Sequence, residues 1–337
     1  MPLLDVRYLI LAVTSRCNLR CRYCYLAAES TGQDMSDRVL DRALDLADHN
    51  SPCHVQVTGG EPALRPDKLI RIGKRCRNMS RGPSLAIQTN GSLLTEELLQ
   101  IFRTYDYQVG ISLDGPPEIH DRQRGMADET LRGLKRLEEQ GIPFRVTTVV
   151  TRENVGYLDR LALLLAGFSN SRGLGLDLLV AKGRAGDLAI QPPSATQLRQ
   201  GMNRLTGALA MINRSRRQPL RLREQDLLAG TGRSPHFCRA ASGQSLAVHP
   251  DGRLYPCGQT MGDPVFACGT VEQPEPLRRQ PLTSIRLQQK DCSACHLNCC
   301  CPDDCPSRLY YNTENRELTC TLYQELDQFQ NNAKRRP

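Results

Sequence analysis

Short apolar runs alternate with amphipathic segments along the first half of the chain, and this alternation constrains the fold more than any other feature. Two of the amphipathic segments are residues 37–48 and residues 129–140, the second of which ends at Gly141. Strands that alternate with helices in this order form a parallel sheet covered by helices. Six such units predict an incomplete barrel of the (βα)6 type, with strands at residues 8–13, 54–57, 85–88, 108–113, 144–150 and 174–180.

Three cysteines follow the first predicted strand with the spacing Cys-x3-Cys-x2-Cys: Cys17, Cys21 and Cys24. A [4Fe-4S] cluster is held by four thiolates, so a loop that offers only three leaves one iron open for a small molecule. A zinc knuckle is the alternative, but a closed zinc site needs a fourth ligand nearby, and the next cysteine or histidine is His49. Barrels of parallel strands carry their reactive groups at the C-terminal ends of the strands, where this loop lies.

The spacing, with Tyr23 directly before the last cysteine, resembles the signature of radical S-adenosylmethionine (SAM) enzymes. The resemblance implies that the open iron binds the amino and carboxyl groups of SAM. After the second predicted strand, Gly59-Gly60-Glu61 resembles the family motif whose backbone and carboxylate contact the methionine amino group. By composition alone these three residues also suit a simple turn.

Two further motifs follow the third and fourth predicted strands, around Asn90-Gly91 and around Ser112 to Gly115. Asn-Gly and Asp-Gly sequences are typical of ordinary turns. Both segments also resemble parts of peptide-modifying members of the radical SAM family. The resemblance implies cofactor contacts from Asn90 and Ser112, and from Arg124, whose guanidinium can pair with a carboxylate.

Composition limits the class of protein. Ten of the 15 cysteines lie in the last hundred residues, but the N-terminus has no pattern of a secretory signal, so the thiols are expected to be reduced metal ligands in the cytoplasm. No apolar run reaches the roughly 18 to 20 residues that a membrane helix needs. The net charge is +8, but the basic residues are spread along the chain and there is no tryptophan, which argues against nucleic-acid binding.

Seven C-terminal cysteines follow a fixed order: Cys238-x13-Gly252-x4-Cys257, then Cys292-x2-Cys295-x5-Cys301-x3-Cys305, then Cys320. This order resembles the SPASM domain, which carries auxiliary iron-sulfur clusters in one branch of the radical SAM family. A zinc ribbon over residues 292–305 is the alternative. The resemblance implies two auxiliary clusters, one on Cys238, Cys257 and Cys305, the other on Cys292, Cys295, Cys301 and Cys320.

The first auxiliary cluster then lacks one protein ligand. Cys268, Cys299 or Cys300 supplies it, or one iron is open to solvent or to a substrate atom. Cys268 is the leading candidate because it follows Cys257 by only eleven residues, on a loop bounded by Gly262 and Gly269.

The expected organisation is a radical SAM partial barrel over residues 1–180, a helical bridge over 181–235, a SPASM domain over 236–325 and a basic tail over 326–337. The expected cofactors are SAM and three [4Fe-4S] clusters. The expected partners are a precursor peptide or protein and a reductant such as flavodoxin or ferredoxin, while leader recognition would come from a separate protein or from another surface. No catalytic residue is assigned.

The preferred function is a maturase that oxidises a side chain of a ribosomally made peptide, forming a thioether or carbon-carbon cross-link. The first alternative is a porphyrin decarboxylase of a haem pathway. A formylglycine-forming sulfatase maturase is disfavoured, because Gly258 stands where the aspartate base of those enzymes follows the cysteine. An iron-sulfur electron-transfer module without catalysis is the third alternative.

Overall fold

A single sheet of nine strands runs through the part of the chain that the structure describes, in the order β7-β6-β5-β4-β3-β2-β1-β8-β9. The structure is a computed structural model that describes residues 5–48, 51–230, 237–275, 282, 292–298, 300–312 and 317–334. The barrel strands are β1 (Tyr8–Ala12), β2 (His54–Thr58), β3 (Ser84–Thr89), β4 (Tyr107–Ser112), β5 (Phe144–Val150) and β6 (Ser171–Leu178). All six are parallel to their neighbours, which confirms the predicted partial barrel.

Alternation along the strands gives the sheet one apolar and one polar face. On β1 and β2, Leu9, Leu11, Val55 and Val57 have no exposed surface and belong to the main core. The residues between them, such as Gln56, are half-buried on the opposite face. Because successive side chains of a strand point to opposite faces, the outer face packs against helices and the inner face of the barrel is partly polar.

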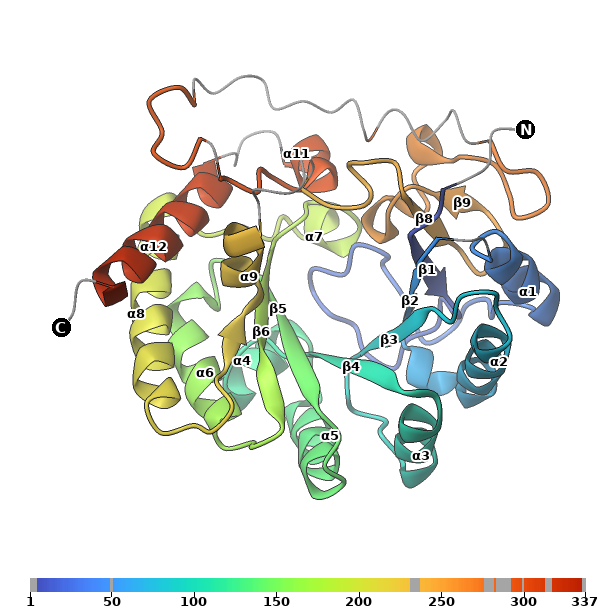
Figure 1. Ribbon diagram of the computed structural model, residues 1–337, viewed down its shortest axis with the longest axis horizontal. Helices are drawn as coiled ribbons and strands as arrows, with labels where there is room; N and C mark the ends of the chain where they lie inside the picture. The colour runs from blue at the N-terminus through green and yellow to red at the C-terminus, as the bar shows by residue number, and fades with distance from the viewer. Residues whose placement is uncertain are drawn as a thin grey trace.

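Helices cover the outer face of the curved sheet, as Figure 1 shows. Residues 37–48 were predicted to be helical and form α1 over Asp37–Asp45, with Ser36 as the N-cap. α8 begins after Ser194 and ends at Asn213, and Ser194 and Gln197 form a capping box at its start. The other helices of the barrel and bridge are α2 (Pro66–Arg77), α3 (Glu96–Tyr105), α4 (Pro117–Gln123), α5 (Ala127–Glu139), α6 (Leu158–Ala166), α7 (Arg184–Asp187) and α9 (Arg223–Gly230).

The cysteine-rich region is joined to the barrel through the sheet itself. β8 (Ser245–Val248) pairs in parallel with β1, and β9 (Leu254–Tyr255) follows β8 in antiparallel pairing. α11 (Pro306–Tyr311) and α12 (Glu317–Lys334) complete the region, and α12 packs on α8. At the other edge of the sheet, β7 (Arg221–Leu222) pairs with β6. Among the described helices, none is both long enough and apolar enough to cross a bilayer.

Candidate functional site

The loop after β1 brings the three N-terminal cysteines together. Cys17, Cys21 and Cys24 pack in one small apolar cluster with Leu19, Leu26 and Ala28. Burial raises the pKa of Cys17 to about 12 and also raises the pKa of Cys21. A thiolate in this loop therefore needs positive charge close by, which bound iron would provide.

The residues of this loop fit a cluster rather than a single ion. Within the described ranges, no three Cys, His, Asp or Glu side chains close around one metal ion. A four-iron cluster takes one thiolate on each iron, so its ligands do not have to converge on a single point. Three thiols in one apolar loop match a cluster that keeps one iron free of protein ligands.

Gly59 and Gly60 pack against the backbone of the cysteine loop. A Cβ atom on Gly59 would lie 2.3 Å from the carbonyl oxygen of Thr14, and one on Gly60 would lie 2.1 Å from that of Arg16. Backbone hydrogen bonds of 2.8 Å join Gly60 N to Thr14 O and Glu61 N to Arg16 O. The two glycines therefore allow the loop after β2 to dock onto the cysteine loop. The SAM contacts of Gly59 and Gly60 stay predictions.

The Glu61 carboxylate connects the loops after β2 and β3. It is only 1% exposed and accepts hydrogen bonds from Ala63 N (2.9 Å), Thr89 Oγ1 (2.6 Å) and Asn90 N (2.8 Å). Burial raises the pKa of Glu61, although these hydrogen bonds act in the opposite direction. Asn90 Nδ2 in turn donates to Asn18 Oδ1 in the cysteine loop, at 2.9 Å. Glu61 and Asn90 lie beside the cysteine loop as expected, and their contacts with SAM stay predictions.

Asp114 is the central hydrogen-bond acceptor of a group of residues that supports Cys21 and Tyr23. It is fully buried and accepts hydrogen bonds from the Tyr23 hydroxyl and from Arg124 Nε, the latter at 2.9 Å. The Arg124 guanidinium lies over the Tyr23 ring, and its Nη1 is 3.7 Å from Cys21 Sγ. Arg124 thus supports the cysteine loop directly, and its pairing with a cofactor carboxylate stays a prediction. Ser112, also a predicted SAM contact, accepts a hydrogen bond from Gln88 Nε2 (2.9 Å).

The segment Ala181 to Arg184, between β6 and α7, touches both cysteine regions. Arg184 donates from Nε to Cys21 O and from Nη1 to Ala28 O, each at 2.9 Å. Lys182 Nζ donates to the carbonyls of Gln259, at 2.9 Å, and of Met261, in the loop after Cys257. These roles could not be predicted from the sequence, because a Lys-Gly-Arg turn in a charged bridge is typical of a solvated surface.

Cys238, Cys257 and Cys305 lie near one another. Cys238 and Cys257 pack against a second apolar cluster that contains Tyr255, Met261 and Phe266. Burial, and then the nearby thiols of Cys305 and Cys238, raise the pKa of Cys257 to about 12. Burial likewise raises the pKa of Cys305 to about 11, with Cys238 contributing. This grouping agrees with the ligand set implied for the first auxiliary cluster, which stays a proposal.

Cys268 belongs to the main core and lies near Tyr255 of the second apolar cluster, against which Cys238 and Cys257 pack. It is 2% exposed, and its backbone N–H donates to Leu254 O (2.9 Å), so the loop folds back onto β9. Ligation by Cys268 stays a prediction, as does the open-iron alternative. Of the other two candidates, Cys300 packs against the main core, whereas Cys299 lies outside the described residues.

The remaining cysteines lie in the segment before α11 and in α12. Burial, with the nearby thiols of Cys320 and Cys295, raises the pKa of Cys301 to about 11. Three of the four ligands implied for the second auxiliary cluster are thus close in space. Cys292 lies in the same short segment as Cys295, whose N–H donates to Cys292 O at 3.0 Å.

Known proteins are similar to parts of this chain in sequence. An uncharacterised protein of Methanocaldococcus jannaschii is 31% identical over 261 residues, which cover 75% of this chain and 85% of the relative. An AdoMet-dependent heme synthase of Oleidesulfovibrio alaskensis is 30% identical over 204 residues, 57% of this chain and 50% of the relative. The subtilosin biosynthesis protein AlbA of Bacillus subtilis is 32% identical over 158 residues, 44% of this chain and 34% of the relative. The chain thus spans half or less of the last two relatives.

Two solved structures have the same fold at low identity. Native anSMEcpe with bound AdoMet has a TM-score of 0.78 at 20% identity, and the match covers 98% of this chain and 100% of that one. Streptococcus suis SuiB bound to its precursor peptide SuiA has a TM-score of 0.65 at 16% identity, over 92% of this chain and 74% of that one.

Residues 11–165 match the family described as the radical SAM superfamily. This range includes the cysteine loop, the glycine loop that docks onto it and the Asp114 network that supports it. The chain belongs to the radical SAM superfamily.

Proposed function

We propose that this radical SAM enzyme is a maturase that oxidises a side chain of a ribosomally made peptide and forms a thioether or carbon-carbon cross-link. One observation carries the proposal: the Ala181 to Arg184 segment contacts both the radical cysteine loop and the loop after Cys257. The two cysteine regions therefore lie close enough for a substrate to meet both. The peptide relatives AlbA and SuiB support the proposal.

The proposed cofactors are SAM and three [4Fe-4S] clusters. When bound, the cluster on Cys17, Cys21 and Cys24 supplies the electron that splits SAM into methionine and the radical that abstracts a hydrogen atom from the substrate. Cys238, Cys257 and Cys305 would hold a second cluster, and Cys292, Cys295, Cys301 and Cys320 a third. The chain's own part is to orient these groups and to exclude water.

Tyr25 lies between the two cysteine regions. Burial raises its pKa, and the thiols of Cys24 and Cys257 add to the effect, followed by Asp177 and Tyr8. Because charges act on a pKa only over short distances, the Tyr25 hydroxyl lies near both cysteine regions. Polar groups of the inner barrel face lie beside it, which suits a peptide better than an apolar ligand.

Gly258 argues against formylglycine formation. A Cβ atom at this position would meet the Tyr25 hydroxyl at 3.7 Å and no described atom more closely, so packing does not require glycine here. The space beside Gly258 would admit a side chain, but glycine provides no carboxylate there. A cross-linking reaction does not need a base at position 258, because another group can accept the proton. It therefore fits Gly258 better than the chemistry of the sulfatase maturases does.

Porphyrin decarboxylation is the second candidate, because an AdoMet-dependent heme synthase is among the relatives. The two candidates differ in their products. We would reconstitute the enzyme anaerobically, supply SAM and a low-potential reductant, and offer the short peptides encoded beside its gene, or iron coproporphyrin in a parallel reaction. Loss of hydrogen from a peptide, seen by mass spectrometry, supports the maturase, whereas loss of carbon dioxide from the porphyrin supports the decarboxylase and overturns the proposal.

The physiological reductant is proposed to be a flavodoxin or ferredoxin. Each can be tested by replacing the chemical reductant in the same reaction. Leader recognition by a separate protein predicts that adding this protein raises the yield of modified peptide.

A further inference from the structure

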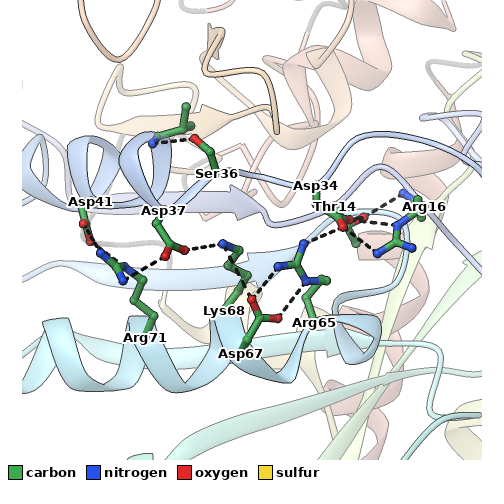
Figure 2. Close-up of polar contacts among 11 residues, drawn as sticks. Thr14, Arg16, Asp34, Ser36, Asp37, Asp41, Arg65, Asp67, Lys68 and Arg71 are labelled. Atoms are coloured by element: carbon green, nitrogen blue, oxygen red, sulfur yellow. Dashed lines mark hydrogen bonds and ion pairs between the residues drawn. The ribbon is translucent and has the colours of Figure 1, made fainter.

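A ladder of ion pairs joins α1 to α2 on the outside of the barrel (Figure 2). Acidic residues on α1 face basic residues on α2 at successive turns. Arg71 Nη2 lies 2.6 Å from Asp41 Oδ2, and Arg75 Nη2 lies 2.6 Å from Asp45 Oδ1. Pairs of this kind on a half-exposed surface contribute little each, typically about 0 to 1 kcal/mol.

The last carboxylate of this series, Asp34, differs from the others because its partners belong to the two loops of the radical site. Its oxygens accept hydrogen bonds from Thr14 Oγ1 (2.6 Å) and from Arg16 Nε (3.0 Å) and Nη2 (2.7 Å). Arg65 Nη1 lies 2.6 Å from Asp34 Oδ2 and is only 18% exposed. One carboxylate thus contacts two guanidinium groups, while Arg65 also pairs with Asp67, as Figure 2 shows.

These partners flank the contact between the two loops. Thr14 and Arg16 offer the carbonyls to which Gly60 N and Glu61 N donate, and Arg16 directly precedes Cys17. Arg65 ends the short 3-10 turn that begins after Glu61. Asp34 therefore holds the cysteine loop from one side and the end of the Gly59–Glu61 loop from the other.

We propose that Asp34 is a positioning residue that fixes the cysteine loop against the Gly59–Glu61 loop, so that the two halves of the SAM site keep their relative orientation. The inference rests on the proposed roles of Cys17 and Glu61 in cluster and SAM binding. Hydrogen bonds from Thr14 and Arg16 and the charge of Arg65 lower the pKa of Asp34 despite the opposing effect of burial, so the carboxylate is ionised at neutral pH.

Asp34→Asn tests this role. The amide keeps the shape but places an NH2 group against guanidinium donors, removes the carboxylate that pairs with Arg16 and leaves Arg65 paired with Asp67 alone. Asp41→Asn is the matched control, because Asp41 makes the same kind of ion pair with Arg71 and Arg75 but touches neither loop. Both variants would be reconstituted anaerobically, and iron content, melting temperature and SAM affinity measured.

We expect Asp34→Asn to weaken SAM binding about tenfold, the effect typical of losing an outer contact at a metal site, and to reduce the change that SAM causes in the electron paramagnetic resonance (EPR) spectrum of the reduced cluster. Asp41→Asn should bind SAM like the wild type. Equal SAM affinity and an equal spectral change in the two variants would overturn the proposal.

Arg65→Lys keeps the experiment decisive if Asp34→Asn fails to retain iron. This variant leaves Thr14 and Arg16 bonded to Asp34 but shortens the link to the Gly59–Glu61 loop, and it should weaken SAM binding in the same direction. Unchanged affinity in Arg65→Lys would then overturn the proposal. A wild-type enzyme that does not bind SAM at all would instead contradict the proposed function.

Discussion

Gly60→Ala tests the docking of the two loops of the proposed radical site. The added Cβ atom would lie 2.1 Å from Arg16 O and 2.8 Å from Ser15 O, far inside normal contact, so one loop must move. Overpacking typically costs about 1 to 3 kcal/mol. The shift would also weaken the hydrogen bonds Gly60 N to Thr14 O and Glu61 N to Arg16 O, each worth about 0.5 to 1.5 kcal/mol. The free energy of unfolding should therefore fall by about 2 to 5 kcal/mol.

Gly207→Ala is the matched control, because the same change there should have the opposite sign. Gly207 lies in α8, is exposed, and has no atom within 4 Å of its Cβ position. Alanine in an exposed helix is favoured over glycine by about 0.5 to 1 kcal/mol. Urea unfolding followed by circular dichroism measures both variants, and SAM affinity should fall only in Gly60→Ala. Wild-type stability and SAM affinity in Gly60→Ala would refute the docking argument.

Three further predictions follow from other contacts. Arg184→Lys removes the planar fork with which Nε and Nη1 donate to Cys21 O and Ala28 O, so the free energy of unfolding should fall by about 1 to 2 kcal/mol. The cluster proposed on the N-terminal cysteines should then lose iron on dilution, and unchanged iron content would contradict this role. Burial, and next the charge of Arg124, lower the pKa of His120 to about 4 from 6.5. As the pH falls, the unfolded chain therefore takes up the proton at a higher pH than the folded chain does. The free energy of unfolding should fall by about 1.4 kcal/mol per pH unit between pH 6.5 and 4, and His120→Asn should reduce this slope. If Cys268 is the fourth ligand of the first auxiliary cluster, Cys268→Ala should change the EPR spectrum of the auxiliary clusters. An unchanged spectrum with all iron retained would overturn this ligation and leave one iron open, while the melting temperature should fall in either case because the thiol is buried.

Local patterns predicted the barrel because they report on burial along each strand. All six expected strands form. Buried and less buried residues alternate on β1, β2, β4 and β5, as at Leu9 and Leu11 on β1, whereas β3 and β6 contain short runs of consecutive buried residues. A helical bridge was expected over residues 181–235, and its main helix, α8, starts at Ala195 because Ser194 and Gln197 form a capping box there. The strand patterns and the helix cap lie within a few residues of the elements that they predict.

Contacts between distant segments could not be predicted in this way. β8 pairs with β1 in the register Tyr8 to Ser245, and nothing in the four residues of β8 indicates so distant a partner. Lys182 and Arg184 contact the two cysteine regions only because the chain folds back between them. The two glycines of the Gly59–Glu61 loop indicated a close approach, but the sequence could not show that the partner is the carbonyl of Arg16 or Thr14.

The formation of 5'-deoxyadenosine from SAM is the most direct test of the account. The anaerobically reconstituted enzyme, supplied with SAM and a low-potential reductant, should form 5'-deoxyadenosine, and the variant in which Cys17, Cys21 and Cys24 are all alanine should form none while keeping its auxiliary iron. Equal 5'-deoxyadenosine formation by the wild type and the triple variant would contradict the assignment of the loop after β1 as the radical site.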